Sequence, residues 1–300
     1  MSIEVTHFND PGCPFGYSAS PALAVLRWRY ADQLEWRLAT IGLTERSEQY
    51  VERGYTPEMM ARSAVTFRRY GMPFSTAPRP RVAATGRACR AIVATRLAFP
   101  DREVAAFRAL QRAWFTTTLL LDEDEAIAAV LDAVPSLDAA AVVAHLDDIE
   151  VTAAYERDRA EARTAAGGPT DFQGKAAATD GPVRYTAPSL ILRRDGQSLE
   201  AGGFQTIEAY DVIVANLDPT LERRPPAPTA AAALQHFADG LTTQEVAAVM
   251  GDAPDRMAAE GELIDLVAAG IASRTAAGDD ALWMARAGRP GPAPRPAERL

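Results

Sequence analysis

Cysteine, lysine and histidine are scarce in this chain. Its 300 residues include two cysteines, three histidines and a single lysine, Lys175. Two cysteines cannot build a disulfide framework, and the histidines at 7, 145 and 236 lack metal-ligand spacing, so we predict no metal site. In a reducing compartment each cysteine is then either a small packed side chain or a reactive thiol.

Long apolar runs are absent as well. No stretch reaches the roughly 18 apolar residues that identify a membrane-spanning helix. Met1-Ser2-Ile3-Glu4-Val5 shows neither the basic nor the apolar region of a secretory signal, so we expect a cytoplasmic protein with no membrane partner. The net charge of −9 offers no general positive surface for nucleic acid or acidic membranes.

The N-terminal segment alternates between strand and helix patterns. Apolar residues alternate over residues 3–8, and the turn signal Asn9-Asp10-Pro11-Gly12 follows directly. Residues 18–31 place apolar side chains three and four apart, as one face of a helix requires, and residues 34–43 alternate again. The order predicted is strand, turn, helix and strand.

A long helical block then interrupts the strands. From about residue 56 to 167 the apolar pattern is helical almost throughout. Residues 189–193 and 198–202 flank an Asp-Gly turn and predict a β-hairpin, and residues 206–217 predict a closing helix. We therefore expect an α/β domain with a large helical insertion.

The C-terminal part differs in composition. Residues 219–229 are proline-rich and predict a linker, and residues 286–300 predict a disordered tail. Residues 230–285 predict a small separate domain similar to a winged helix, with Gly278-Asp279-Asp280 in its wing. This domain carries two arginines against nine carboxylates, a net charge of −7. Because DNA affinity depends on neutralising phosphates, we expect a protein partner here and no DNA.

The sequence around the first cysteine resembles that of a known family. Asp10-Pro11-Gly12-Cys13-Pro14-Phe15-Gly16-Tyr17 is similar to the Asp-Pro-x-Cys-Pro-Trp-Cys-Tyr signature of the DsbA-like family, which includes 2-hydroxychromene-2-carboxylate isomerases and kappa-class glutathione transferases. Arg112-Ala113-Trp114-Phe115 looks like a stretch in the helical insertion of those isomerases. Thr186-Ala187-Pro188-Ser189 is similar to the family's cis-proline loop, and Gly203-Phe204-Gln205 to its closing segment. The resemblance covers about residues 1–218 and implies a thioredoxin-like fold.

The resemblance places the active site at Cys13, with Pro11, Pro14, Phe15 and Gly16 completing the motif. A cysteine at a helix N-terminus lies near unpaired N–H groups and the positive end of the helix dipole. We therefore expect a lowered thiol pKa and a nucleophilic thiolate. Gly16 stands where a resolving cysteine is expected, so a mixed disulfide at Cys13 could not resolve internally. The alternative is an inherited cysteine on a scaffold that has lost activity.

Four further residues are candidates for substrate binding. We expect Ala187 and Pro188 to form a cis peptide bond that faces Cys13. Trp114 and Phe115 either line an apolar pocket over Cys13 or only pack in the core.

The second cysteine, Cys89, lies in a helical pattern between two arginines. A packed side chain is the first interpretation, and a distant resolving thiol is the alternative. If Cys89 is packed away from the cleft, changing Gly16 to cysteine should restore the missing thiol and raise dithiol exchange.

These residues predict a thiol-dependent enzyme. The first hypothesis is a monothiol oxidoreductase-like protein that uses Cys13 with a low-molecular-weight thiol as cofactor, and with a small thiol or an electrophilic molecule as substrate. One alternative is an isomerase or glutathione-transferase-like enzyme of the same family. Another is a non-enzymatic binding protein that uses the thioredoxin cleft and the acidic C-terminal domain as interaction surfaces, and a DNA-binding regulator ranks third.

Overall fold

A four-stranded mixed sheet lies at the centre of the N-terminal part. The computed structural model describes residues 2–179 and 181–286. The strands of this sheet are β1 (Ile3–Asn9), β2 (Leu34–Thr40), β5 (Ser189–Arg194) and β6 (Gln197–Ala201). In the order β2-β1-β5-β6, β1 is parallel to β2 and antiparallel to β5, and β5 and β6 form the expected hairpin.

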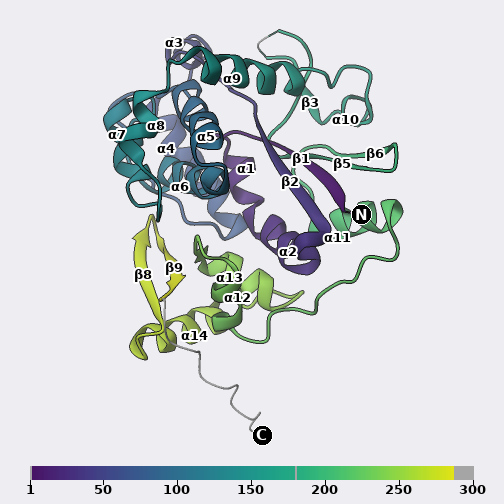
Figure 1. Ribbon diagram of the computed structural model, residues 1–300. Helices are drawn as coiled ribbons and strands as arrows, with labels where there is room; N and C mark the ends of the chain where they lie inside the picture. Colours follow the sequence, from purple (N-terminus) through teal and green to yellow (C-terminus); the bar gives the residue numbers. More distant parts are fainter. Residues whose placement is uncertain (1, 180, 287–300) are drawn as a thin grey trace, which may run out of the picture.

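Helices cover both faces of this sheet (Figure 1). On one face, α2 (Ser20–Tyr30) and α11 (Ile207–Leu217) share a core with Ile3 and Val5 of β1. On the other face, α9 (Ile149–Ala162) packs along β2. The alternation of side chains along β1 decides which of them enters which core.

The helical insertion forms a layer beside the sheet and has the largest apolar core of the described residues. Its first long helix, α4, has a capped start: Thr56 accepts a hydrogen bond from the backbone N–H of Met59, and Pro57 occupies the first helical position. The elements of this part are α3 (Glu48–Glu52), α4 (Pro57–Phe67), α5 (Gly86–Ala98), α6 (Glu103–Thr116), α7 (Asp124–Leu131), α8 (Ala139–Ala144), α10 (Pro169–Phe172), β3 (Ala176–Ala177) and β4 (Arg184–Tyr185).

The helix predicted over residues 18–31 corresponds to α2, and a separate short helix precedes it. A short helix, α1 (Pro14–Ser18), comes first, and α2 starts after a break at Ala19. Pro21 explains the break, because it has no N–H to donate to the carbonyl of Tyr17. The active-site turn is therefore followed by a single helical turn.

Residues 230–285, called the C-terminal module below, form helices around a three-stranded sheet of order β7-β9-β8. The module packs on the face of α2 that points away from the main sheet (Figure 1), where Val25 and Trp28 share a core with Leu234, Val246 and Trp283. Its elements are α12 (Ala230–His236), β7 (Leu241–Thr242), α13 (Thr243–Met250), α14 (Arg256–Ala268), β8 (Ala272–Ala277) and β9 (Asp280–Ala285).

The segment predicted to be a linker is fastened to α2. The indole N–H of Trp28 donates to the carbonyl of Pro225 at 2.8 Å, and the Arg224 guanidinium lies 4.0 Å from the Trp28 ring centre. The division into two domains and the winged-helix assignment stay predictions. Except for Arg286, the tail predicted to be disordered lies outside the described residues.

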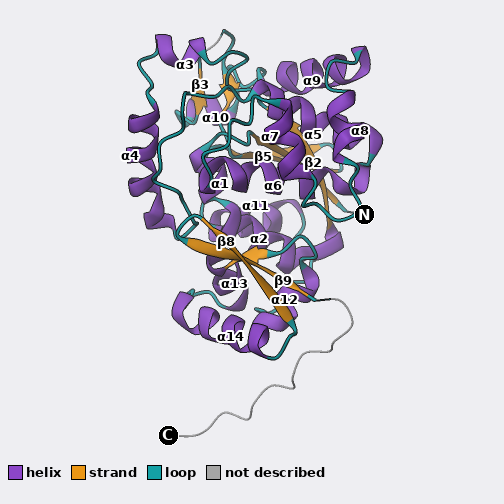
Figure 2. Ribbon diagram, turned by 90° about the vertical axis from the view of Figure 1, so that its left-hand side faces the viewer, coloured by secondary structure: helices purple, strands orange, loops and turns teal. Residues whose placement is uncertain are grey.

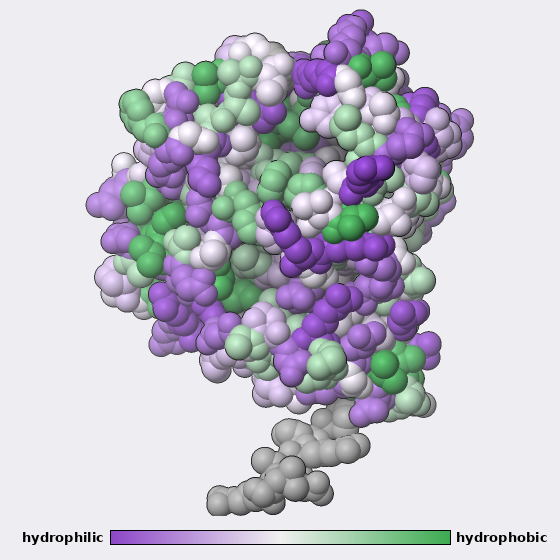
Figure 3. All heavy atoms as spheres, turned by 180° about the vertical axis from the view of Figure 1, so that it is seen from behind, coloured by the Kyte–Doolittle hydropathy of each residue, from purple (hydrophilic) through white to green (hydrophobic). Residues whose placement is uncertain are grey.

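No helix within the described ranges has both the length and the apolar character needed to cross a membrane. On the face shown in Figure 3, hydrophobic and hydrophilic residues are interspersed.

Replacing Trp28 by alanine should lower the free energy of unfolding of the whole chain by about 3–5 kcal/mol, because the indole fills the core between α2 and the C-terminal module. The measurement is denaturant unfolding followed by circular dichroism. Met257→Ala is the control, since Met257 is 84% exposed on α14 and should change stability by less than ~0.5 kcal/mol. Equal effects of the two changes would contradict the shared core.

Candidate active site

Cys13 lies at the carboxyl end of β1, as the N-terminal cap of α1. A tight turn brings it there, with the Cys13 N–H donating to the carbonyl of Asp10 at 3.1 Å. Pro14 follows at the first helical position, where no N–H donor is required. The turn, the cysteine and the helix thus lie in the order that the motif predicts.

The Cys13 thiol faces the loop before β5. Its Sγ is 3.2 Å from the carbonyl oxygen of Ala187, and the Ala187–Pro188 peptide bond is cis, as expected. The side chain is 9% exposed. The turn after β1 and the loop before β5 therefore bracket the sulfur closely.

The expected lowering of the Cys13 pKa is wrong for this structure. Burial raises the pKa of the thiol to about 11, and the nearby Asp10 carboxyl adds to the shift. The backbone N–H groups of Gly16 and Phe15 do lower the pKa, as a helix N-terminus should, but they do not outweigh desolvation. At neutral pH the resting state is the thiol.

Asp10 organises the backbone around this cysteine. Its carboxyl oxygens accept hydrogen bonds from the N–H of Gly12 at 2.8 Å, the N–H of Leu43 at 2.9 Å and the hydroxyl of Thr85 at 3.1 Å. The thiol of Cys89 lies 3.5 Å from the same carboxyl group. Burial raises the pKa of Asp10, and the hydrogen bonds from these donors partly offset that rise. The donors therefore replace some of the hydration that the buried carboxyl loses.

Cys89 is packed in α5, as expected. It is 0% exposed, and burial next to carboxylates raises its pKa well above the usual value for a thiol. It does not line the cavity beside Cys13. A resolving role would require α5 to open.

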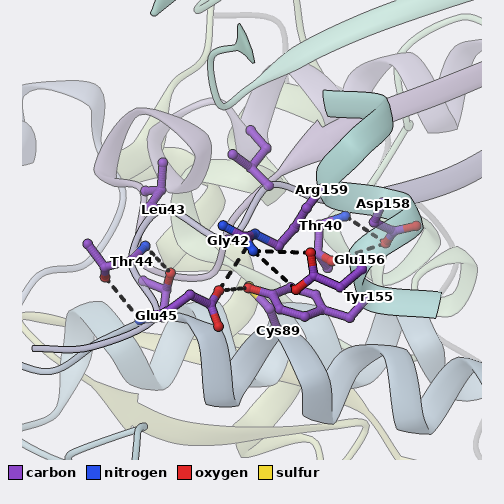
Figure 4. A network of polar contacts seen from close by, with 12 residues as sticks. Thr40, Gly42, Leu43, Thr44, Glu45, Cys89, Tyr155, Glu156, Asp158 and Arg159 are labelled. Carbon is purple, nitrogen blue, oxygen red and sulfur yellow. Dashed lines mark hydrogen bonds and ion pairs between the residues drawn. The ribbon is translucent and has the colours of Figure 1, made fainter. Parts of the chain in front are cut away.

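The loop after β2 is fixed from behind by α9 (Figure 4). Glu45 accepts a hydrogen bond from the Tyr155 hydroxyl and forms an ion pair with Arg159. Farther along, Asp158 accepts hydrogen bonds from the N–H and hydroxyl of Thr40 at 2.9 and 3.0 Å. These contacts fix the chain from Thr40 to Glu45. Tyr50, which lines the cavity described below, follows this segment.

A cavity of about 340 Å³ opens beside Cys13. Gly12, Pro14 and Phe15, the neighbours of the cysteine, line one side. Trp114 and Phe115 also line the cavity, and both pack in or against the core of the helical insertion, so the two interpretations hold together.

Aromatic residues that sequence reasoning missed complete the apolar wall. Phe67 of α4 and Phe74 after it line the cavity, and Phe67 packs edge-on against Phe15 with ring centres 4.9 Å apart. Phe204 does not line the cavity, but its ring centre lies 6.3 Å from that of Phe15. The resemblance marked the segment that holds Phe204, but no local pattern distinguished Phe67 and Phe74 from core residues.

The charged residues that line the cavity within the described chain are all positive. Four arginines contribute to the lining and, within the described residues, no carboxylate does. Arg53 donates to the carbonyl of Thr179, Arg79 to the carbonyls of Trp114 and Leu119, and Arg81 is paired with acidic residues outside the cavity. The fourth arginine is Arg184.

Tyr50 is a further residue that the sequence did not single out. It lines the cavity, and its hydroxyl is close enough to Asp10 and Cys13 for their charges to raise its pKa, together with burial as the larger cause. Tyr50 therefore stays a neutral hydrogen-bond donor at all ordinary pH values. Such a donor can stabilise a sulfur that gains negative charge.

The histidines lie away from the cysteine. His7 and His236 line a second cavity of about 600 Å³, between α2, α6 and the C-terminal module, and burial lowers the pKa of His7 to about 3. His145 pairs with Asp148 on the surface at 2.8 Å. Within the described ranges, no group of three or more acidic, histidine or cysteine side chains could hold a metal ion.

The profile of the DSBA-like thioredoxin domain matches residues 4–184. The chain belongs to this family. The DSBA-like family includes thiol–disulfide oxidoreductases, and the sheet, the cysteine-bearing turn and the helical insertion described above are its fold. The C-terminal module lies beyond the matched residues.

Solved structures show the same fold at low identity. The cytosolic disulfide reductase DsbM from Pseudomonas aeruginosa is 18% identical, with a TM-score of 0.51 over 72% of this chain and 100% of that one. A probable DsbA oxidoreductase from Streptomyces coelicolor is 18% identical, with a TM-score of 0.54 over 75% of this chain and 92% of that one. No curated protein matches this chain in sequence.

Alkylation of Cys13 should be slow at neutral pH and rise tenfold per pH unit toward pH 11. Relative to a thiol with pKa ~8.5, the thiolate fraction at pH 7 is about 300-fold lower, and the greater nucleophilicity of a more basic thiolate recovers roughly tenfold. We expect iodoacetamide to react about 30-fold more slowly than with free cysteine, measured by intact mass on Cys89→Ser protein. A rate plateau near pH 8 would contradict this.

Gly16→Cys alone should not restore dithiol exchange, contrary to the expectation from the sequence. A Cβ at Gly16 would overlap the side-chain oxygen of Asn9. Asn9 cannot turn away cheaply, because that oxygen accepts from the Asp10 N–H at 2.8 Å and its amide nitrogen lies 2.9 Å from a His7 ring nitrogen. The single variant should lose about 1–3 kcal/mol of stability.

Adding Asn9→Ala to Gly16→Cys removes the overlap and should allow a disulfide between Cys13 and the introduced cysteine, detected by insulin reduction and mass analysis. Gain of exchange in the single variant without loss of stability would disprove the steric argument.

Proposed function

We propose that this DSBA-like protein is a monothiol enzyme in which Cys13 exchanges disulfides with a low-molecular-weight thiol that carries carboxylates. The observation that carries the proposal is the cavity beside Cys13, with four arginines and no carboxylate among its described lining residues. The chain as a whole is acidic, at −9, so this positive lining is a local feature.

The charge of Arg79 is the strongest support for an anionic ligand. Burial lowers the pKa of Arg79 to about 10, yet the guanidinium remains a cation at neutral pH. Within the described residues its hydrogen bonds go to neutral carbonyls rather than to a carboxylate. Asp122, which does not line the cavity, is the nearby charge that raises the pKa of Arg79, and a ligand carboxylate would add a direct charge-assisted hydrogen bond.

The proposed reaction starts when Cys13 loses its proton and its thiolate attacks one sulfur of a bound disulfide. A Cys13–S–S–R mixed disulfide forms, the bond between the two ligand sulfurs breaks, and the second sulfur leaves as a thiolate that takes up a proton. Tyr50, which lines the same cavity and stays neutral, is our candidate for a hydrogen-bond donor to that leaving sulfur. A second small thiol then attacks the mixed disulfide, returns the Cys13 thiol and leaves as the new disulfide.

The high pKa of Cys13 favours accumulation of the mixed disulfide. A thiol of high pKa is a poor leaving group, so the step in which a second small thiol expels Cys13 is slow and the mixed disulfide accumulates. Gly16 removes the internal competitor, and Cys89 is buried against Asp10. Strong oxidants of this fold owe their potential to a stabilised thiolate, so a thiol of raised pKa argues against Cys13 acting as a strong oxidant.

The raised pKa also supports the alternative of an isomerase or glutathione-transferase-like enzyme. In that case Cys13 stays a thiol, and a bound small thiol reacts with an electrophilic substrate. Cys13→Ser separates the two functions, because it abolishes disulfide exchange but leaves binding of the small thiol in the arginine-lined cavity.

A cytoplasmic location is part of the proposal, and the structural neighbour DsbM is described as cytosolic. A thiol resting state suits a reducing compartment. We propose no DNA or membrane partner, on the −7 charge of the C-terminal module and the overall charge of −9. A protein partner of the module remains a hypothesis.

Arg79→Gln should slow mixed-disulfide formation with glutathione disulfide about tenfold, because one charge-assisted hydrogen bond to a ligand carboxylate is lost. The reaction with neutral 2-hydroxyethyl disulfide should change less than twofold, with rates followed by intact mass. Arg62→Gln is the matched control, since Arg62 is an exposed arginine of α4 that does not line the cavity. If Cys13 shows no preference for the anionic disulfide in the parent protein, the proposal is wrong.

A further inference from the structure

The segment between α4 and α5 supplies the wall of the cavity that faces the C-terminal module. Phe74 of this segment is 1% exposed and packs between Tyr17, Phe67 and Phe115, with ring centres 5.3, 6.0 and 5.3 Å away. Phe67, Phe74 and Phe115 all line the cavity. The position of Phe74 therefore sets the shape of the apolar wall of the cavity.

The tip of the β8–β9 hairpin holds Phe74 in place, and Figure 2 shows the hairpin reaching the end of α4. The Asp279 carboxyl accepts a hydrogen bond from the backbone N–H of Phe74 at 2.8 Å and pairs with Arg68 at 2.8 Å. Arg68 in turn donates to the carbonyl of Phe74 at 3.1 Å. The backbone of one residue is thus held from both sides by a single ion pair.

Gly278 makes this approach possible. Its φ is +56°, and a Cβ there would lie 2.8 Å from the carbonyl carbon of Phe74. Two more contacts join the same segment to the module: Gly71 packs against the side chain of Gln244, and the Thr242 hydroxyl lies 3.4 Å from the Met72 sulfur.

We propose that Asp279 is a positioning residue for the cavity beside Cys13, and that the C-terminal module sets the selectivity of this site for aromatic and other bulky apolar groups. Asp279 touches no ligand and acts through the backbone of Phe74. The ion pair between Arg68 and Asp279 is partly exposed, so dissolved salt screens it and it contributes little. The hydrogen bond from the Phe74 N–H to Asp279 is therefore the main restraint on the backbone of Phe74. The inference rests on the proposed function only in taking this cavity as the substrate site.

The test compares two alkylating reagents on full-length Cys89→Ser protein. Iodoacetamide is small, and N-phenylmaleimide brings a ring that must enter the aromatic wall. The readout is the ratio of the two Cys13 rates, divided by the same ratio for free cysteine. We expect a normalised ratio above one in the parent and a fall of about threefold or more in Asp279→Ala, the effect of losing one hydrogen bond.

Asp279→Asn should keep most of the parent ratio, because an amide oxygen can still accept from the Phe74 N–H. Asp265→Ala is the matched control, an exposed aspartate of α14. Thermal midpoints are measured for all variants.

An unchanged ratio in Asp279→Ala would overturn the proposal, and so would equal slowing with both reagents, which would place the change at Cys13 itself. These outcomes are independent of the glutathione disulfide preference, so failure of the positioning role and failure of the proposed function can be told apart.

Discussion

The buried carboxyl group of Asp10 is the constraint on which the site depends. A carboxylate removed from water costs several kcal/mol unless the protein replaces its hydration. Here the replacement comes from three separate segments: the turn at Gly12, the loop at Leu43 and the start of α5 at Thr85. Its backbone carbonyl also receives the N–H of Cys13. One side chain thus fixes the turn, the loop after β2 and α5 relative to each other.

The same group that builds the turn makes its cysteine less acidic. A negative charge near Cys13 opposes a second negative charge on its sulfur, and desolvation adds to this. The N–H groups of the one-turn helix α1 lower the pKa of Cys13, but by less than burial and the Asp10 charge raise it. Stability of the turn and acidity of the thiol therefore compete, and the competition accounts for a cysteine that rests as a thiol in a motif associated with thiolates.

The sequence revealed the parts of the site that are local in the chain. The turn signal, Cys13 and Pro14 lie within one short motif, so strand, turn and helix could be predicted from neighbouring residues. The pKa of Cys13 could not, because its sign depends on burial and on how many donors reach Asp10 from distant segments. The break at Ala19 was visible in principle, since Pro21 removes one helical donor.

Residues that meet only in space escaped prediction for a similar reason. The arginines of the cavity come from the loops before and after α4 and from β4, and nothing in the local pattern around Arg53, Arg79 or Arg184 marks them as neighbours. The helical periodicity that correctly predicted α4 treats Phe67 as an ordinary core residue. Whether such a ring packs or lines a cavity is decided by what lies opposite it.

The acidic charge of the C-terminal module has an explanation inside the chain. Glu245 is almost fully buried and pairs with Arg108 of α6 at 2.9 Å, and Asp279 pairs with Arg68. Removal of either arginine would leave a carboxylate at the interface without its partner, which is costly where the group is buried. Two of the nine carboxylates of the module thus serve to dock it onto arginines of the helical insertion. Those pairs flank the segment around Phe74. The contacts that dock the module therefore also help to fix the shape of the cavity beside Cys13.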